Sequence, residues 1–337
     1  MFDLTRPLDQ IQSVSPDPGT HWKAKSIAIE APPDDDVNPS PDAVWPKGAQ
    51  RSGLCGAVTP RVVALQGGVL RMYYTQILPR DGCPAGANDY GNASARILSA
   101  TSTDGENWSP EPGVRLSPQQ GGAGDFRVVS AEVVPVPNGG GKLRMYFECC
   151  PGTQSIQNSI RSAISDDGLE WEVEQDARLE LDSCNLTSPR ILFLADGQCR
   201  MFCGAQGRGI ISAISNDGLT FEVEPGTRIA PGDTLDRAVA FAAEIIRLDD
   251  GYRMYYAGYS KPQRADILTA TSADGIHWQK DETPVLSPGS KPWDAVKCSE
   301  MCIIRVADQF HMFYEACDGT AADQRGVWRI AHAVCDV

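Results

Sequence analysis

Five charged residues stand near the start of five similar apolar runs, and they are the first candidates for chemistry. The runs read VTPRVVAL, VSAEVVPV, TSPRILFL, FAAEIIRL and CSEMCIIRV, and the charged residues in them are Arg61, Glu132, Arg190, Glu244 and Glu300. Glutamates act as general acids or bases, and arginines bind carboxylates through paired N–H donors. Arginines beside glutamates also depress the pKa of the carboxyl group. Brought together, these side chains would suit acid–base chemistry on a bound polar molecule.

A second repeated phrase ends in two more glutamates. Its copies LRMYYT, LRMYFE, CRMFCG, YRMYYA and FHMFYE have as their last residues Thr75, Glu148, Gly204, Ala257 and Glu315. We expect this phrase to form the strand that runs back beside each apolar run. Its last residues should then lie on the same face as the charged residues at the start of that run. We therefore predict that Glu148 and Glu315 line a binding site together with Arg61, Arg190 and Thr59.

A third phrase shows which elements position these residues. SATSTDGENW, SAISDDGLEW, SAISNDGLTF and TATSADGIHW begin at Ser99, Ser162, Ser212 and Thr269. Asp-Gly between two alternating runs is a strong hairpin signal, and the aromatic residue after it can pack on a neighbouring sheet. Each unit therefore predicts a four-stranded antiparallel sheet. The second phrase recurs at intervals of 73, 56, 53 and 58 residues.

Five such units predict an all-β chain that forms one five-bladed β-propeller over residues 1–337. The expected blades span about 54–117, 118–181, 182–230, 231–287 and 288–337. The last unit lacks an outer strand, and the segment SVSPDPGTHWKAKSIAIE resembles the missing piece. We therefore expect residues 13–30 to supply the strand that closes the last blade.

Two segments interrupt the repeat. Residues 31–53 are rich in Pro and Asp and predict a long loop before the first blade. Residues 76–94 form an insertion in the first blade that contains Tyr90. Long loops on a rigid scaffold often carry function, so we expect both segments to act as lids and Tyr90 to contact a substrate.

Composition argues against several classes of protein. The net charge of -14 disfavours binding to nucleic acid and to anionic membranes, and no apolar run is long enough to cross a bilayer. The N-terminus does not read as a signal peptide, and eleven cysteines is an odd number, so we expect reduced thiols and a cytoplasmic location. We expect no cofactor and no metal, because the paired cysteines lack zinc-ligand spacing and histidines are scarce.

The sequence YRMYYAGYS…DILTATSADGIHWQKDETPVLSPG…WDAV resembles the repeats of the five-bladed propeller glycosidases, families 32, 43, 62, 68 and 130. The resemblance covers nearly the whole chain and implies an active site in the central funnel. It also implies two acidic residues that cleave a glycosidic bond, one as a proton donor and one as nucleophile or base.

This chain departs from that pattern in the first unit. Where the family carries an acid at the start of the inner strand, the chain reads VTPR, with Thr59 and Arg61. The family's base residue therefore cannot be transferred to this sequence, and only the general placement of carboxylates remains.

Three functions stay open at this point. The first is an enzyme that processes a sugar or glycoside, with Glu132, Glu244 and Glu300 as the acid–base set and Arg61 and Arg190 orienting the substrate. The second is a non-hydrolytic lyase, isomerase or cyclase, which the Arg and Glu pattern and the missing acid favour. The third is a binding module without turnover. Glutamates that all pair with arginine would argue against hydrolysis, and a narrow apolar pocket would favour the second function.

Overall fold

The computed structural model describes residues 14–33, 35–36, 38–82, 90–232, 234–320 and 326–336. Within these residues the chain forms strands joined by turns and two short 3-10 helices, η1 (Gln66–Gly68) and η2 (Pro292–Asp294). The described strands form five groups of four antiparallel strands, which we call blades one to five. A single parallel pair of residues links blade one to blade two, and another links blade four to blade five.

The blades follow one another along the chain. Blade one contains β2 (Gly56–Ala64), β3 (Leu70–Leu78), β4 (Ser94–Ser102) and β5 (Ser109–Pro110), and blade two contains β6 (Arg127–Pro135), β7 (Leu143–Cys150), β8 (Ser159–Ser165) and β9 (Glu172–Val173). Blade three contains β10 (Leu186–Phe193), β11 (Cys199–Ala205), β12 (Gly209–Ser215) and β13 (Glu222–Val223). Blade four contains β14 (Val239–Leu248), β15 (Gly251–Lys261), β16 (Arg264–Ser272) and β17 (Gln279–Lys280). Blade five contains β18 (Lys297–Val306), β19 (Gln309–Cys317), β20 (Trp328–Asp336) and, from the start of the chain, β1 (Lys23–Ile29).

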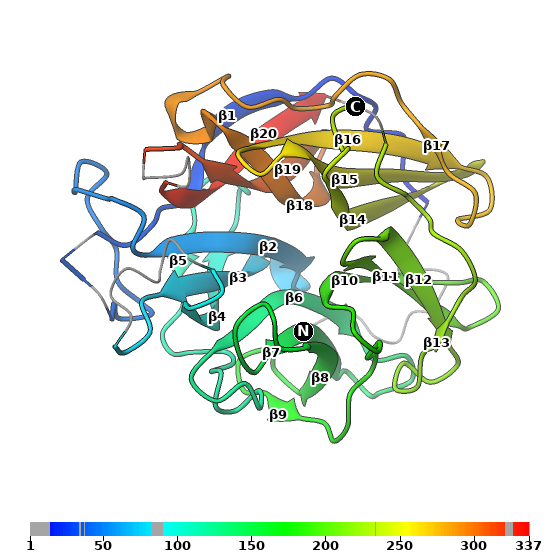
Figure 1. The fold of residues 1–337 in the computed structure, drawn as a ribbon, viewed down its shortest axis with the longest axis horizontal. Helices are drawn as coiled ribbons and strands as arrows, with labels where there is room; N and C mark the ends of the chain where they lie inside the picture. Colours follow the sequence, from blue (N-terminus) through cyan, green and yellow to red (C-terminus); the bar gives the residue numbers. More distant parts are fainter. Residues whose placement is uncertain are drawn as a thin grey trace.

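The first strand of each blade faces a common centre. Strands β2, β6, β10, β14 and β18 contact one another in this order, and β18 contacts β2 (Figure 1). This closed ring of inner strands is the arrangement of a β-propeller, which confirms the predicted fold class.

Strand β1 closes the ring, as the sequence predicted. It pairs antiparallel with β20, from Lys23 opposite Val334 to Ile29 opposite Ile330 (Figure 1). Pairing of the two ends of the chain in one sheet covers an edge that would otherwise expose unpaired backbone groups.

Pairs of aromatic side chains join neighbouring blades. In each pair, a ring from the second strand of one blade meets edge-on the ring that follows the outer turn of the next blade. Interplanar angles are 79–89° and centroids lie 5.2–6.2 Å apart. The pairs are Tyr73–Trp171, Tyr146–Phe221, Phe202–Trp278, Tyr255–Trp22 and Phe313–Trp108. This geometry suits the quadrupoles of the rings, and it explains why an aromatic residue follows the repeated Asp-Gly.

The repeated Ser-x-Asp-Gly is a turn motif. In blade one, Ser102 Oγ accepts hydrogen bonds from the N–H of Asp104 and Gly105. Asp104 Oδ1 accepts from the N–H of Glu106 and Asn107. The residue Gly105 has φ 74°, a value that favours glycine. The same bonds recur around Asp167, Asp217 and Asp274. The phrase is therefore structural in all four blades.

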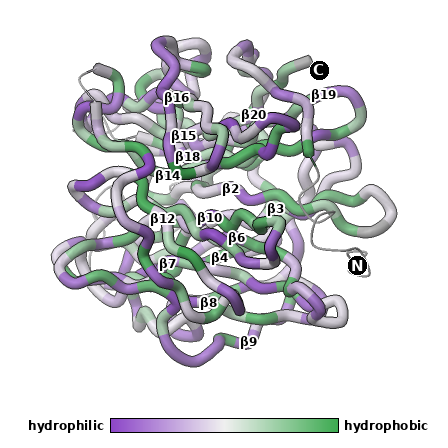
Figure 2. Tube along the Cα trace, turned by 90° about the vertical axis from the view of Figure 1, so that its right-hand side faces the viewer, coloured by the Kyte–Doolittle hydropathy of each residue, from purple (hydrophilic) through white to green (hydrophobic). Residues whose placement is uncertain are grey.

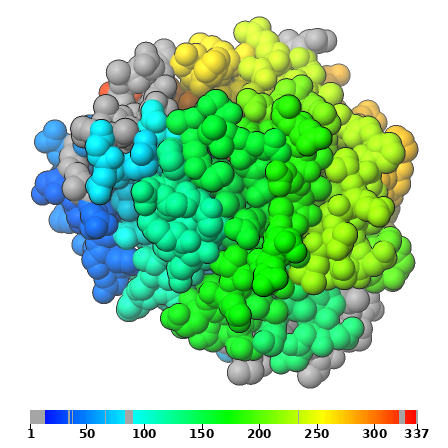
Figure 3. Space-filling model, turned by 60° about the horizontal axis from the view of Figure 1, so that its bottom comes forward, coloured from blue at the N-terminus to red at the C-terminus, as the bar shows by residue number. Residues whose placement is uncertain are grey.

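The core is divided among the junctions between blades. One cluster joins Tyr146 and Ile160 of blade two to Ile191, Met201 and Phe221 of blade three. The surfaces of these two blades are continuous in the space-filling view (Figure 3). Hydrophobic and hydrophilic segments alternate along the trace, as expected for strands that link an apolar interior to polar turns (Figure 2). The result is a rigid frame around a central axis.

Candidate functional site

A bulge at the same place in each inner strand points particular side chains at the axis. In blades one to four the bulged residue has a positive φ of 51–56°, and these residues are Thr59, Ser130, Ser188 and Ala242. Bulges bend a strand and redirect the side chains beside them. Two residues further on, each strand turns a side chain inward, and those side chains are Arg61, Glu132, Arg190 and Glu244.

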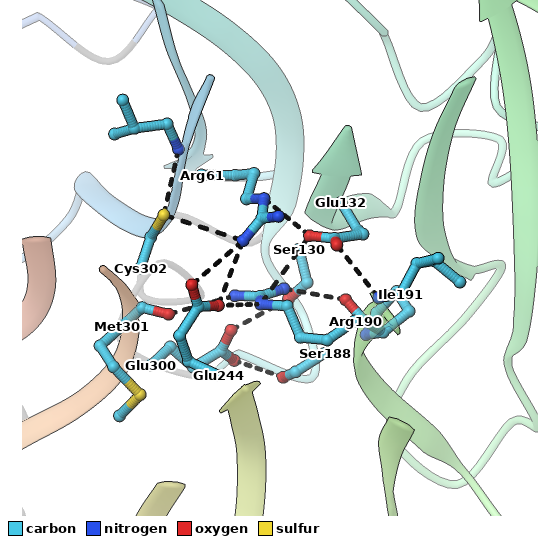
Figure 4. A network of polar contacts seen from close by, with 12 residues as sticks. Arg61, Ser130, Glu132, Ser188, Arg190, Ile191, Glu244, Glu300, Met301 and Cys302 are labelled. Atoms are coloured by element: carbon cyan, nitrogen blue, oxygen red, sulfur yellow. Dashed lines mark hydrogen bonds and ion pairs between the residues drawn. The ribbon is translucent and has the colours of Figure 1, made fainter. Parts of the chain in front are cut away.

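These four residues form one ion-pair network on the axis (Figure 4). Arg61 Nε lies 2.8 Å from Glu132 Oε2, and Arg61 Nη1 lies 3.1 Å from Glu244 Oε2. Arg190 Nε lies 3.3 Å from Glu244 Oε2 and 4.0 Å from Glu132 Oε2. Two guanidinium groups thus neutralise two buried carboxylates, and each glutamate contacts both arginines.

The fifth place in this ring belongs to Cys302 rather than to Glu300. Met301 pairs with Tyr314 and Cys302 with Phe313, so Cys302 has the register of Arg61, Glu132, Arg190 and Glu244. The predicted equivalence of Glu300 with the other four residues is therefore wrong. Glu300 occupies the bulge position itself, the place of Thr59, Ser130, Ser188 and Ala242.

The axial side chains also bind the backbone of the next blade. Glu132 accepts a hydrogen bond from the N–H of Ile191 (3.0 Å), Glu244 from Ile303 (3.2 Å), and Cys302 Sγ from Val62 (3.3 Å). Burial raises the pKa of Glu132, although Arg61 and Arg190 oppose this shift. The predicted depression of its pKa is therefore wrong, because desolvation outweighs the two positive charges. These contacts join neighbouring blades at the axis. We call the network of Arg61, Glu132, Arg190 and Glu244 the axial clamp.

A cavity of about 590 Å³ lies at the bulged ends of the inner strands, and three carboxyl groups line it. They belong to Glu148 at the end of β7, Glu315 near the end of β19, and Glu300 in β18. All three residues are at least 94% buried. Thr59, Ser130 and Thr187 line the same cavity, whereas the four axial ion-pair residues do not.

Hydrogen bonds fix each of the three carboxyl groups. Glu148 Oε1 accepts from the N–H of Ser188 (2.6 Å), and Glu300 Oε1 accepts from the hydroxyl of Ser188 (2.8 Å). Glu300 Oε2 also accepts from Ser130 Oγ (3.4 Å) (Figure 4). Glu315 accepts from the N–H of Thr59 (3.0 Å) and from Ser299 Oγ (2.8 Å).

The three groups hold their protons more tightly than exposed glutamates. Burial, and then the charge of Glu300, raises the pKa of Glu148 to about 8. The same two causes raise the pKa of Glu315 well above its usual range. Burial also raises the pKa of Glu300, but Arg190 and the hydroxyls of Ser188 and Ser130 oppose the shift. Of the three groups, Glu300 is the one whose neighbours stabilise a negative charge through both a guanidinium group and two hydroxyls.

Aromatic residues and a lysine complete the wall. Tyr90, Tyr259 and Trp328 line the cavity, and Lys297 Nζ lies 5.5 Å from the ring centre of Tyr259 and 5.1 Å from that of Trp328. Lys297 has the same place in blade five as Arg127 in blade two, because both pair with the third strand of the preceding blade.

The residue Arg127 anchors the wall from behind. Its guanidinium donates to the carbonyls of Gly91 (2.9 Å) and Gly152 (2.9 Å) and lies 4.6 Å from the ring centre of Tyr90. Arg127 thereby holds the end of the blade-one insertion, of which residues 83–89 lie outside the described part of the chain.

The structure separates the predicted site residues into two groups. Glu300, Glu148, Glu315, Thr59 and Tyr90 line one cavity. The other four, Glu132, Glu244, Arg61 and Arg190, form the axial clamp. Sequence reasoning missed Ser130, Ser188, Lys297 and Trp328, although Ser130 and Ser188 share the position of Thr59 in their phrases.

Three observations on the described residues concern metal ligands and apolar helices. No group of three or more His, Cys, Asp or Glu side chains among them is placed to hold a metal ion. Cys199, Cys203, Cys298 and Cys302 are buried thiols whose pKa values burial raises. No helix in the described part of the chain is long and apolar enough to span a bilayer.

Comparisons with known proteins identify the fold. No family model matches the sequence, and no curated protein matches it either. A solved glycoside hydrolase superposes with a TM-score of 0.68 and 19% identity, covering 91% of this chain and 92% of its own. A thermostable family-43 glycoside hydrolase gives 0.65 and 15%, covering 86% and 92%. The β-1,2-mannobiose phosphorylase from Listeria innocua, in complex with β-1,2-mannobiose, gives 0.64 and 15%, covering 91% and 96%. The chain therefore has the fold of the glycoside hydrolase-like propellers.

Proposed function

We propose that the protein is a glycoside-processing enzyme that uses Glu148, Glu300 and Glu315 in the central cavity. The observation that carries this proposal is the convergence of three buried carboxyl groups, whose pKa values are raised, on one cavity. Cleavage of a glycosidic bond needs a protonated carboxyl group and a carboxylate within one site. The fold shared with sugar-processing enzymes supports the same conclusion.

The environment of each carboxyl group suggests its role. We assign the role of the carboxylate to Glu300, because Arg190 and the hydroxyls of Ser188 and Ser130 oppose the rise in pKa that burial causes. Glu148 is the general acid, because it keeps its proton up to about pH 8. In this mechanism Glu148 gives its proton to the leaving oxygen as the carbon–oxygen bond breaks. Glu300 takes a proton from the attacking water or attacks the sugar carbon itself.

The proposal moves two of the residues expected from the sequence out of the reaction. Glu132 and Glu244 are each shared by two arginines and a backbone N–H, so neither offers a free carboxyl group to a substrate. Arg61 and Arg190 affect the reaction indirectly, because they hold the inner strands together through Glu132 and Glu244. Arg190 additionally stabilises the charge of Glu300.

A second candidate is a non-hydrolytic lyase, isomerase or cyclase. The wall formed by Val58, Ile77, Tyr90, Phe241 and Trp328 favours it, because an apolar wall protects a reactive intermediate from water. The first blade also contributes Thr59 to the cavity where a hydrolase of this fold would be expected to contribute an acid.

The test is a panel of 4-nitrophenyl α- and β-glycosides and of disaccharides, assayed with the wild type and with Glu148→Gln and Glu300→Gln. We expect conversion by the wild type and losses of about 10²–10⁴-fold in each variant. Glu222→Gln, on the exposed outer strand of blade three, is the control for loss of a glutamate.

Two results would count against the proposal. Equal activity in the wild type and both variants would remove the carboxyl groups from the mechanism. Binding of sugars without any conversion would identify the protein as a binding module. A product with the mass of the substrate, or of the substrate less water, would instead favour the second candidate.

A further inference from the structure

A second cavity, which we call the side groove, opens from the central one over blade three. Its volume is about 530 Å³, and Thr187, Phe241 and Tyr259 are among the residues that line both spaces. The two spaces are therefore adjacent, and the side groove is the nearest place for a part of a ligand that extends beyond the carboxyl groups. Each volume lies in the range typical of ligand sites.

The groove lies where the second strand of a blade ends earlier than it does in blade four. Strand β11 ends at Ala205, one residue after Gly204, and β12 begins at Gly209. In blade four, β15 continues to Lys261, four residues beyond the equivalent Ala257. The hairpin of blade three is thus too short to wall off the cavity on this side.

A glycine keeps the floor of the groove open. Gly204 stands where blades two and five carry Glu148 and Glu315. A Cβ atom at this position would lie 2.4 Å from Thr187 Oγ1 and 2.9 Å from Phe241 Cβ. The absence of a side chain at Gly204 therefore allows Phe241 to lie beside Thr187 at the junction of the two spaces.

The chemistry of the groove differs from that of the central cavity. The rings of Phe241 and Tyr259 lie 5.7 Å apart at 49° and form an apolar platform. The amide side chains of Gln154, Asn185 and Gln206 lie around it, and the described residues that line it include no carboxylate. The guanidinium of Arg237 stands among the lining residues and donates to the carbonyl of Ser260. Apolar faces with neutral amides suit a sugar ring, which presents C–H groups and hydroxyls.

We propose that the side groove is the subsite for the leaving part of the substrate, and that the substrate is therefore a disaccharide or oligosaccharide. One sugar unit lies at the three carboxyl groups, and the next lies on Phe241 and Tyr259. This inference rests on the proposed function, because it takes the central cavity as the place of bond cleavage.

The test compares a disaccharide with the glycosyl fluoride of the same sugar. Fluoride is a small leaving group that needs only the central cavity, so the ratio of the two kcat/KM values reports on the groove. Gln206 is exposed on the β11–β12 turn, and Gln206→Trp fills the groove. We expect this variant to lower the ratio of disaccharide to fluoride about tenfold or more, mainly through KM.

Two further variants make the test specific. Arg208→Trp places the same ring two residues away on the same exposed turn, outside the residues that line either space, and should leave the ratio unchanged. Phe241→Leu removes the aromatic platform but keeps an apolar side chain, and should lower the ratio as well. Thermal unfolding checks that each variant is folded.

The outcomes separate this inference from the proposed function. If the wild type converts both substrates and Gln206→Trp leaves their ratio unchanged, the groove is not a subsite, although the cavity remains an active site. The same holds if Gln206→Trp and Arg208→Trp have equal effects. If the wild type converts no fluoride and no disaccharide, the proposed function itself fails, and the inference fails with it.

Discussion

Glu148 and Glu300 come from different blades and share one hydrogen-bond donor residue. The backbone N–H of Ser188 donates to Glu148 Oε1 at 2.6 Å, and its hydroxyl donates to Glu300 Oε1 at 2.8 Å. Ser188 can serve both because it lies on a bulge with φ 51° between the two glutamates. The relative placement of the proposed acid and base therefore depends on the backbone of a third blade.

We predict that removing the hydroxyl of Ser188 weakens catalysis and moves the acidic limb of the pH–rate profile upward. In Ser188→Ala the carboxylate of Glu300 loses a donor, so its pKa should rise. The expected loss in kcat/KM is about 10–100-fold, the value of a hydrogen bond to a charged group.

Two controls separate this effect from a change in the backbone. Ser188→Gly also lacks the hydroxyl but relieves the positive φ, so it should be as inactive as Ser188→Ala and about 1 kcal/mol more stable. Ala242→Gly, at the same position in blade four, measures the backbone effect without any hydroxyl. An unchanged pH–rate profile in Ser188→Ala would contradict the assigned role.

We predict that Glu148→Gln stabilises the protein at alkaline pH while it abolishes activity. The folded protein keeps the proton of Glu148 up to about pH 8, whereas the unfolded chain releases it near pH 4.5. The free energy of unfolding of the wild type therefore falls as the pH rises through this interval, by up to about 4 kcal/mol. Glutamine keeps the acceptor for the N–H of Ser188 and carries no charge.

The measurement is Tm against pH for the wild type, Glu148→Gln and the exposed control Glu222→Gln. The difference in Tm between Glu148→Gln and the wild type should grow in favour of the variant from pH 5 to pH 9, and should not grow in the control. A difference that stays constant with pH would mean that Glu148 ionises in the folded protein like an exposed glutamate.

The sequence predicted the frame because the frame repeats. The Asp-Gly turns, the aromatic residue after them and the closing segment are copied almost unchanged, since each copy solves the same packing problem. Trp22 illustrates this, because it fills for blade five the role that Trp171 fills for blade two.

The site was harder to predict because it lies where the copies differ. Glu300 was aligned with Glu132 and Glu244 by its residue type, which shifted it by two positions. A better signal was present, because every axial residue directly precedes two branched apolar residues, and Cys302 precedes Ile303 and Ile304. The raised pKa values come from burial among distant strands, so no local pattern reports them.

We predict that the axial clamp contributes to stability and that its members are coupled. Arg61→Met leaves Glu132 with only Arg190, at 4.0 Å, so a buried charge loses its main partner. The expected cost is about 3–5 kcal/mol. The double variant Arg61→Met/Glu132→Gln removes both charges and should recover part of this loss.

Denaturant unfolding of the two single variants and the double variant gives the coupling energy between Arg61 and Glu132. A double-mutant cycle in which the two effects simply add would show that the ion pair contributes nothing by itself. The opposite pair of charges, Arg190 and Glu244, offers an independent repeat of the cycle.

We predict that acid destabilises the closure of the propeller through a pair of histidines. His311 in β19 and His332 in β20 are stacked with ring centroids 4.9 Å apart, and His332 Nε2 lies 3.0 Å from His311 Nδ1. They replace the arginine and the serine or threonine that the other blades carry at these positions, such as Arg71 and Ser99. A hydrogen bond between the rings requires one nitrogen to accept, so a second proton would set two donors face to face.

The direction of the pH effect follows from the pKa of His332. Burial, and then the neighbouring His311, lowers this pKa to about 4, and Lys25 lowers it further while Glu106 opposes the shift. The unfolded chain binds a proton near pH 6.5, where the folded protein does not. The free energy of unfolding should therefore fall by about 2–3 kcal/mol as the pH drops from 6.5 to 4.

Tm measured from pH 7 to pH 4.5 tests this prediction. His332→Gln cannot gain the charge, so its Tm should fall less steeply with acid than that of the wild type. His277→Gln, at an exposed outer turn, should fall as steeply as the wild type. Equal slopes in all three proteins would place the acid sensitivity elsewhere. A shallower slope in His332→Gln would locate it where β1 completes the ring, because Ser26 of that strand lies 3.5 Å from His332 Nδ1.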